Sequence, residues 1–146
     1  MRTPIPLPMR YLWLMAALIG ALTPATLFAQ AAISPAASIA GQLGTPFSTI
    51  LGVDDYTAVT DPDGLLGAPG LYIAKARFMD SANIAGDVEV FANARDTRTR
   101  LGSLAGASAA GQEVDVQQGL VIVRLYFLSG DPSPYKAALG LALGAP

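Results

Sequence analysis

The stretch from Leu120 to Leu128, which reads LVIVRLYFL, restricts the fold more than any other part of the chain. It is apolar at odd and even positions alike, and Arg124 is its one charged residue. A strand of this kind is covered on both of its faces, or nearly so, and lies inside a sheet. The sequence therefore predicts a β-sheet in which this strand is interior.

Three further strands are predicted from alternating side chains and turn residues. Residues 71–79 place Tyr72, Ala74, Ala76 and Phe78 on one face, and Leu71, Ile73, Lys75, Arg77 and Met79 on the other. In residues 86–92, Val88 and Val90 alternate with Asp87, Glu89 and Phe91. The turn that begins at Asp80 joins these two strands as an antiparallel hairpin. Residues 113–116 and 120–128, separated by the turn 117–119, are predicted to form a second hairpin.

Capping signals predict three helices. Thr45 and Pro46 resemble an N-cap and a first-turn proline, which predicts one or two helical turns that end at Gly52. A long ordered loop is expected at 54–70. Asn93 is expected to cap a helix that runs to Leu104, followed by a mobile loop over 105–111. Ser133 and Pro134 are expected to be the N-cap and the first position of the last helix, which runs to Leu143 and is stopped by Gly144.

The predicted fold class is therefore α+β, with the element order α-β-β-α-β-β-α. The expected architecture is a four-stranded antiparallel sheet with helices on one face. The 146 residues are enough for one domain, which we place at 45–146.

The first 31 residues have the order of a secretory signal peptide. Arg2 and Arg10 are followed by an uncharged apolar run and then by small residues, with cleavage expected after Ala29 or Ala31. Residues 32–44, rich in Ala, Ser and Gly, are expected to be a flexible leader. The chain is thus predicted to be exported, to the periplasm or the outside of the cell, and to meet a membrane only through an uncleaved signal.

The composition excludes several kinds of chemistry. The chain has no His and no Cys, so Ser-His-Asp and Cys-His catalysis, the usual zinc sites and disulfides are excluded. Removal of Arg2 and Arg10 with the signal would leave the mature chain with more acidic than basic residues. Nucleic acid is therefore not an expected partner, because phosphate binding needs a basic patch. No cofactor is expected.

The segment Asp61-Pro62-Asp63-Gly64 has two interpretations. Asp61 and Asp63 could contribute oxygens to a calcium site, with Gly64 permitting the bend. The third ligand position and the distant Glu of the calcium-loop signature are missing. Asp-Pro followed by Asp-Gly is also ordinary turn chemistry.

Four charged residues lie inside predicted strands: Lys75, Arg77, Glu89 and Arg124. A buried guanidinium needs a partner, and Glu89 is the first candidate for Arg124, with Glu113 next. These residues could form an anion-binding site on the sheet. Alternatively, they could be structural ion pairs, or an arginine whose stem is buried while its head reaches water.

The chain also resembles a family of small, exported, uncharacterised bacterial domains, many of them actinobacterial and some lipid-anchored. Their core reads D-P-N-x-L-L-G-R-P-G-x-Y-x-S-K-x-x-F-x-D, followed by a strand like G-x-V-E-V-F. The matching positions are Asp61-Pro62, Leu65-Leu66-Gly67, Pro69-Gly70, Tyr72, Lys75, Phe78, Asp80, Gly86, Val88-Glu89-Val90-Phe91, Glu113, Arg124 and Tyr135. Ala68 and Ala74 replace an Arg and a Ser of the family pattern. The resemblance implies the fold and export, and no activity.

We therefore expect a non-catalytic binding or envelope-structural module, whose partner is an envelope protein or a small ligand. One alternative is a secreted hydrolase that uses carboxylates, which would need two converging acids, one with a raised pKa, in a deep pocket. The other alternative is a domain stabilised by calcium in the Asp-rich loop.

Overall fold

The computed structural model describes residues 32–111, 113–126 and 131–144. The described helices and strands are, in chain order, α1 (Pro35–Ala40), β1 (Ile50–Asp55), β2 (Ala74–Asp80), β3 (Ala85–Val90), α2 (Ala94–Ala109), β4 (Glu113–Gln118), β5 (Val121–Tyr126) and α3 (Ser133–Ala142). The predicted signal peptide at 1–31 and the end of the predicted strand at 127–128 lie outside these residues.

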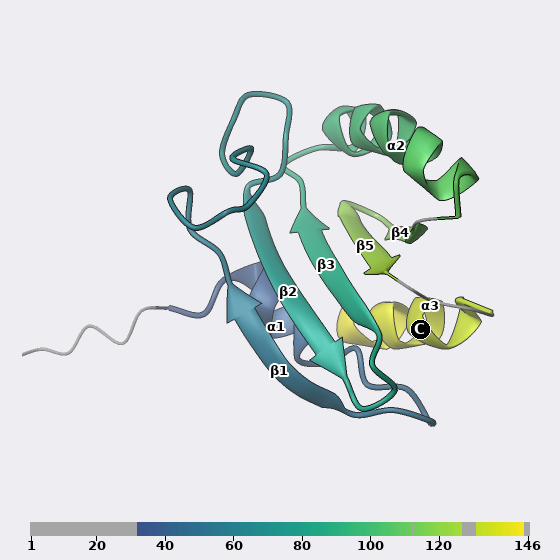
Figure 1. Ribbon diagram of the computed structural model, residues 1–146. Coiled ribbons are helices and arrows are strands. Elements are labelled where there is room, and N and C mark those ends of the chain that lie inside the picture. Colours follow the sequence, from purple (N-terminus) through teal and green to yellow (C-terminus); the bar gives the residue numbers. More distant parts are fainter. Residues whose placement is uncertain (1–31, 112, 127–130, 145–146) are drawn as a thin grey trace, which may run out of the picture. The chain divides into compact units, whose positions relative to one another are not determined.

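The strands form one antiparallel sheet in the order β1-β2-β3-β5-β4 (Figure 1). Both predicted hairpins are confirmed, β2 with β3 and β4 with β5. The α+β class is also confirmed, but the expectation of four strands is wrong, because β1 adds a fifth strand beside β2. The interior position of the apolar strand is confirmed, since β5 pairs with β3 on one side and β4 on the other.

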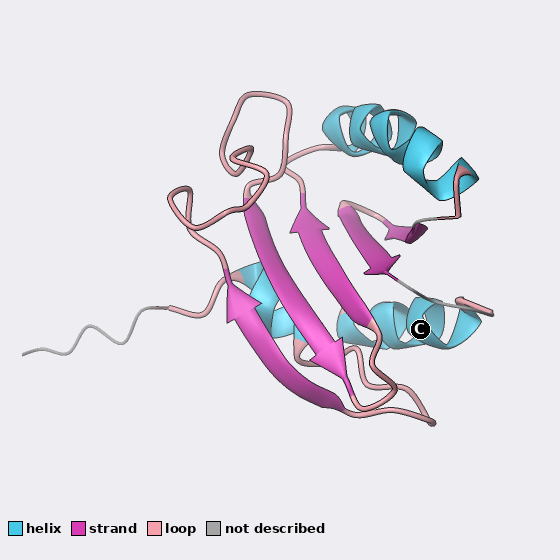
Figure 2. Cartoon of the chain, viewed as in Figure 1, coloured by secondary structure: helices cyan, strands magenta, loops and turns pink. Residues whose placement is uncertain are grey.

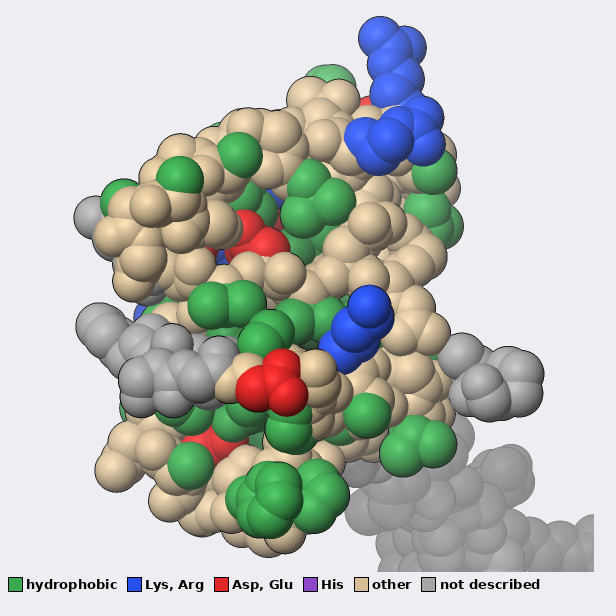
Figure 3. Space-filling view, turned by 90° about the vertical axis from the view of Figure 1, so that its right-hand side faces the viewer, with side chains coloured by type: hydrophobic (Ala, Val, Ile, Leu, Met, Phe, Trp, Pro, Cys, Tyr) green, Lys and Arg blue, Asp and Glu red, His purple; other side chains and the backbone are tan. Residues whose placement is uncertain are grey.

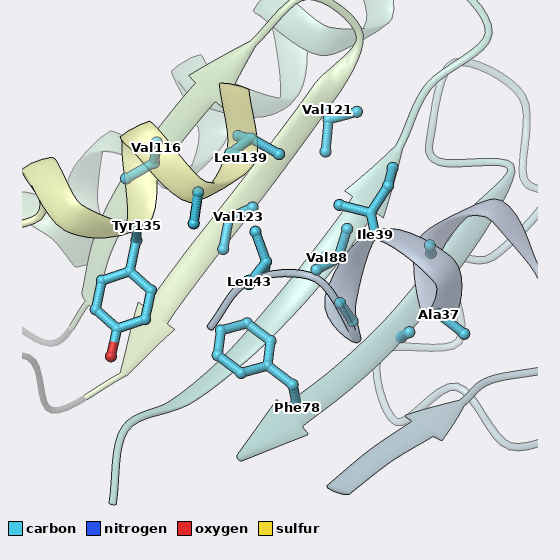
Figure 4. Packing of buried hydrophobic residues seen from close by; sticks show 14 of the residues in the cluster. Ala37, Ile39, Leu43, Phe78, Val88, Val116, Val121, Val123, Tyr135 and Leu139 are labelled. Carbon is cyan, nitrogen blue, oxygen red and sulfur yellow. The ribbon is translucent and has the colours of Figure 1, made fainter. Parts of the chain in front are cut away.

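One face of the sheet is apolar and carries α1 and α3. Small side chains of β2 lie under α1, because Ala74 and Ala76 belong to the same buried cluster as Ala36 and Ala40. Small residues on both sides allow the helix to approach the strands closely. Figure 4 shows Leu43, Phe78, Val123, Tyr135 and Leu139 gathered between the strands and these helices.

The other face of the sheet carries α2 and the long loop between β1 and β2 (pink in Figure 2). Leu104 of α2 packs with Tyr72, Phe91 and Ile122 in a second apolar cluster. Ile122 alternates with Val121 and Val123, which belong to the first cluster, so the two clusters lie on opposite faces. The expectation that helices cover one face is therefore wrong.

The segment predicted as a flexible leader contains α1. Ser34 Oγ accepts the N–H of Ala37, and Pro35 stands in the first turn, where its missing N–H costs nothing. Ala36 and Ala40 are fully buried. Residues 32–44 thus belong to the packed domain, and the domain boundary at 45 was placed too late.

The helix predicted at Thr45–Gly52 is absent from the structure. Thr45 and Ser48 form an isolated bridge, and Thr45 Oγ1 accepts the N–H of Phe47, which makes a tight turn. The chain then runs into β1, with a β-bulge between Ile50 and Gly52. A Thr that bonds the N–H two residues on is a turn signal as well as a cap signal.

The capping of α2 by Asn93 is confirmed, since its side chain accepts the N–H groups of Arg95 and Asp96. The helix is longer than predicted, because it continues through the expected mobile loop to Ala109. Helix α3 is found close to its predicted place, but the predicted N-cap is wrong, because Ser133 is the first helical residue and Pro132 is the cap, without a side-chain bond.

Candidate functional site

Most charged side chains of β2 to β5 lie on the face of the sheet beneath α2 and the long loop. We call them the charged layer: Asp61, Asp63, Lys75, Arg77, Asp87, Glu89, Arg100, Glu113, Asp115 and Arg124. It contains four cations and six carboxylates. All four predicted binding residues and both predicted metal ligands belong to it.

Lys75 is the centre of the layer and is fully buried. Its Nζ lies 3.1 Å from Asp61 Oδ1, 2.6 Å from Asp63 Oδ2 and 3.5 Å from Asp87 Oδ2. The rings of Tyr56 and Tyr72 lie within 6 Å of the ammonium. Burial alone would lower the pKa of Lys75, but the hydrogen bond to Asp63 and the nearby carboxylates raise it above its ordinary value.

Asp61 organises the loop that covers Lys75. Its carboxylate accepts the N–H groups of Asp63, Leu65 and Leu66 at 2.9–3.2 Å, the hydroxyl of Tyr72 at 2.8 Å, and the ammonium of Lys75. Burial alone would raise the pKa of Asp61, but these hydrogen bonds hold it well below its usual range.

The Asp61-to-Gly64 segment is thus a turn in this structure, as one of its two interpretations requires. Gly64 has a φ of +66°, which suits a glycine in a tight bend. The donors around Asp61 occupy both of its oxygens. No group of three or more potential metal ligands lies together in the described part of the chain.

Arg77 and Asp87 form a two-bond ion pair between β2 and β3. Nε donates to Oδ1 at 2.8 Å and one terminal nitrogen donates to Oδ2 at 3.2 Å. Tyr126 also donates its hydroxyl to Asp87, at 3.0 Å. Arg77 is 40% exposed, so it borders solvent while its partner is buried.

Glu89 accepts two bonds from Arg100 of α2, at 2.9 and 2.8 Å, and a third from Arg124 of β5 at 3.3 Å. Arg124 also donates to Glu113 Oε2 at 2.7 Å. Both acidic partners that the sequence suggested for Arg124 are therefore confirmed. Glu89 and Lys75 stand directly opposite each other in the β2–β3 register, but Glu89 is neutralised by the two arginines.

Sequence reasoning missed Arg100, which lies on a helix and not on a strand. It occurs three residues after buried Thr97 and four before buried Leu104. This spacing places Arg100 on the face of α2 that packs on the sheet, and it was the signal available in the sequence.

Asp115 is the second residue that was missed. Its Oδ2 accepts the hydroxyl of Ser108 at 2.6 Å, while its Oδ1 has no partner among the described residues. Oε1 of Glu113 is also buried without a partner there. Burial raises the pKa of Asp115, and the charges of Glu113 and Glu89 add to the rise.

The described surface offers no cavity for a substrate. No pocket is found over the residues that the structure describes, and none of their helices is long and apolar enough to cross a membrane. On the side shown in Figure 3, basic side chains stand in separate groups rather than in one continuous patch.

No family model, no curated protein and no solved structure matches the chain.

Proposed function

We propose that the chain is a small exported domain that binds an envelope partner through its surface, without catalysis. The observation that carries this proposal is the internal pairing of the charged layer. Lys75, Arg77 and Arg124 each contact at least one buried carboxylate of the chain itself. An anionic ligand would have to displace these carboxylates, so the cations favour a structural role over ligand binding.

The edge of the sheet formed by β1 is the surface that best suits such a contact. Leu51 and Val53 of β1 are 67% and 36% exposed, and Met79 on the adjoining strand is 50% exposed. The bulge at Leu51 and the exposed Asp54 and Asp55 are features that discourage another strand from pairing at an edge. We therefore expect the partner to contact side chains here, with apolar and basic groups facing Leu51 and the two aspartates.

Site-specific crosslinking tests the proposal. A photoreactive residue replaces Leu51 in the exported chain in its native envelope, and a matched chain carries it at Leu141, which is 79% exposed on α3. We expect one protein to crosslink from position 51 and not from 141. The purified partner should then bind the unmodified chain, and Leu51→Asp should weaken that binding. Crosslinking from neither position, or equally from both, would contradict the proposed surface.

A carboxylate hydrolase remains the alternative, because one observation favours it. Asp115 has a raised pKa and lies on the same face of β4 as Glu113, which matches the pair of acids that such an enzyme needs. Their partnerless oxygens are buried, so a substrate could reach them only after α2 moved. Hydrolysis of a glycoside or ester by the chain, lost in Glu113→Gln, would replace the binding proposal with this one.

A further inference from the structure

The charged layer is short of positive charge at its β4 end. Its carboxylates outnumber its cations by two when all of them are ionised. Both partnerless oxygens, Glu113 Oε1 and Asp115 Oδ1, belong to β4. The two residues are two positions apart on one strand, so their side chains leave the same face. A buried carboxylate oxygen without a hydrogen-bond donor is costly, so this position favours protonation of one of the two acids.

A proton is the positive group that fits this position. The side chain of Glu113 is 3% exposed, and the structure has no described cavity that could take a hydrated metal ion. Calcium would need six or more oxygen ligands, and no group of three potential ligands among the described residues is arranged to hold a metal ion. One proton on Asp115 Oδ1 would remove one negative charge and supply a donor for Glu113 Oε1.

Groups from every neighbouring element act on Asp115. They are Glu113 on β4, Arg124 on β5, Glu89 on β3 and Ser108 on α2. Tyr126, Arg100 and Asp63 act on these neighbours instead: Tyr126 on Glu113, Arg100 on Glu89 and Asp63 on Arg124. Helix α3 packs on the opposite face of β4, where its Lys136 is exposed to solvent. Burial and the two acids favour the protonated form of Asp115, whereas Arg124 and the Ser108 hydroxyl favour the ionised form.

We propose that Asp115 is the proton site of the charged layer, and that it shares its proton with Glu113 and thereby holds the C-terminal half of α2 on β4. Asp115 Oδ1 carries the proton and donates it to Glu113 Oε1, while Oδ2 keeps the hydroxyl of Ser108. When the pH rises, the proton leaves to solvent, the two carboxylates repel each other, and the Ser108 end of α2 loosens. The docking of α2 on β4 therefore depends on the pH of the compartment that the chain occupies.

The sign of the pH dependence follows from the raised pKa. Stability contributed by the protonated acid is fully present below the pKa of an unfolded Asp, about 3.9, and is lost as the pH rises through the folded pKa. Asp115→Asn mimics the protonated form, because the amide can donate to Glu113 and accept from Ser108. Asp115→Leu also removes the charge but provides neither bond.

The test measures urea unfolding of wild type, Asp115→Asn and Asp115→Leu from pH 3.5 to 8. We expect the Asn variant to exceed wild type at pH 8, the gap to close as the pH falls, and the Leu variant to remain below the Asn variant throughout. At pH 8, amides of residues 106–110 should exchange with solvent more slowly in the Asn variant than in wild type. Asp131→Asn, which removes an exposed acid of lowered pKa, should show the opposite dependence.

Three outcomes would overturn the proposal. Parallel pH profiles for wild type and the Asn variant would show that Asp115 does not titrate in this range. Equal stability of the Asn and Leu variants would show that charge alone matters and no proton is shared. Unchanged amide exchange in α2 would show that the proton on Asp115 does not affect the docking of the helix. If both variants failed to fold, titration of the Asp115 carboxyl by NMR in wild type would decide, with a midpoint at or below 3.8 as the contradicting result.

Discussion

At the scale of single residues, the charged layer depends most on Lys75. Three carboxylates lie within 3.5 Å of its ammonium, and the side chain is fully buried. A buried ion pair adds little net stability over an apolar replacement of both partners, but removal of one partner leaves a buried charge uncompensated. The cost of losing Lys75 is therefore set by the acids that remain.

Lys75→Met should lower the free energy of unfolding by about 3–5 kcal/mol, because Asp61, Asp63 and Asp87 lose their shared cation. Urea unfolding at neutral pH measures this. Lys136→Met on α3 is the matched control, since Lys136 is exposed and should change stability by less than about 0.5 kcal/mol. Equal effects of the two substitutions would show that the Lys75 contacts contribute little.

Two glycines offer a sharper comparison at the same scale. A Cβ at Gly86 would lie 2.5 Å from the ring of Phe78 and 2.9 Å from the carbonyl oxygen of Arg124, whereas one at Gly102 would meet nothing within 4 Å. Gly86→Ala should therefore cost about 1–3 kcal/mol or more through overpacking. Gly102→Ala, in the middle of α2, should add about 0.5–1 kcal/mol through helix propensity. Thermal melts of both variants check the opposite signs.

Some residue roles could be predicted from strand periodicity and others could not. Alternation placed Lys75 and Arg77 on one face, and the need for a partner identified Glu89 and Glu113 for Arg124. Asp61 binds Lys75 from a loop 14 positions earlier in the chain. Strand periodicity carries no information about such a contact. The role of Asp115 depends on Ser108, in a segment that its small residues made resemble a loop.

At the scale of elements, β1 and α1 show where local signals fail. The Thr45-Pro46 pair is compatible with a helix start, but pairing with β2 gives Ile50–Asp55 a ladder of hydrogen bonds that a short helix cannot match. The Ala-rich stretch before β1, residues 32–44, has few large apolar side chains, so its sequence gives little indication of a packed helix. It becomes a helix because the small residues of β2 leave room for it.

The contact between α3 and the turn after β2 gives a pH-dependent prediction. Tyr135 donates its hydroxyl to Asp80, which also accepts the hydroxyl of Ser48 and two backbone N–H groups. Burial alone would raise the pKa of Asp80, but these bonds lower it. Its stabilising effect is therefore present above the unfolded pKa, about 3.9, and is lost as the pH falls.

Tyr135→Phe should cost about 1.5–3 kcal/mol at neutral pH, the range for a hydrogen bond to a charged group. The difference from wild type should shrink as the pH falls below about 3.9, because folded Asp80 then takes up a proton, first in the variant, which lacks the Tyr135 bond that lowers its pKa. Urea unfolding at pH 7 and pH 3 measures both values. Ser103→Ala, which removes an exposed helix hydroxyl, should give a small difference that does not vary with pH. A constant cost for Tyr135→Phe would contradict the link to Asp80.

At the scale of the whole domain, the sheet separates two kinds of interior. The apolar face packs α1 and α3 by hydrophobic contact, while the other face combines a smaller apolar cluster with the charged layer. The antiparallel sheet and both hairpins could be predicted, because they follow from nearby residues. The packing of α2 on the second face of the sheet could not be predicted. The spacing of Thr97, Arg100 and Leu104 indicates a packed side of the helix, but it does not say which face of the sheet that side contacts.

Removal of α1 tests whether the apolar face needs it. A chain that starts at Ala32 keeps every element of the described fold, and a chain that starts at Thr45 lacks α1 and the fully buried Leu43. Burial of Ile39 and Leu43 alone contributes about 3–6 kcal/mol, against a typical total of about 5–15 kcal/mol for a domain. The shorter chain should therefore lose its cooperative thermal unfolding or melt at a much lower temperature, and should bind a dye specific for exposed apolar surface.

The longer chain with Ile33→Ser, at a position 76% exposed, should melt like the unaltered one. Identical melting of the two chain lengths would mean that the sheet is stable with this face uncovered, and that residues 32–44 act as the leader their composition suggests.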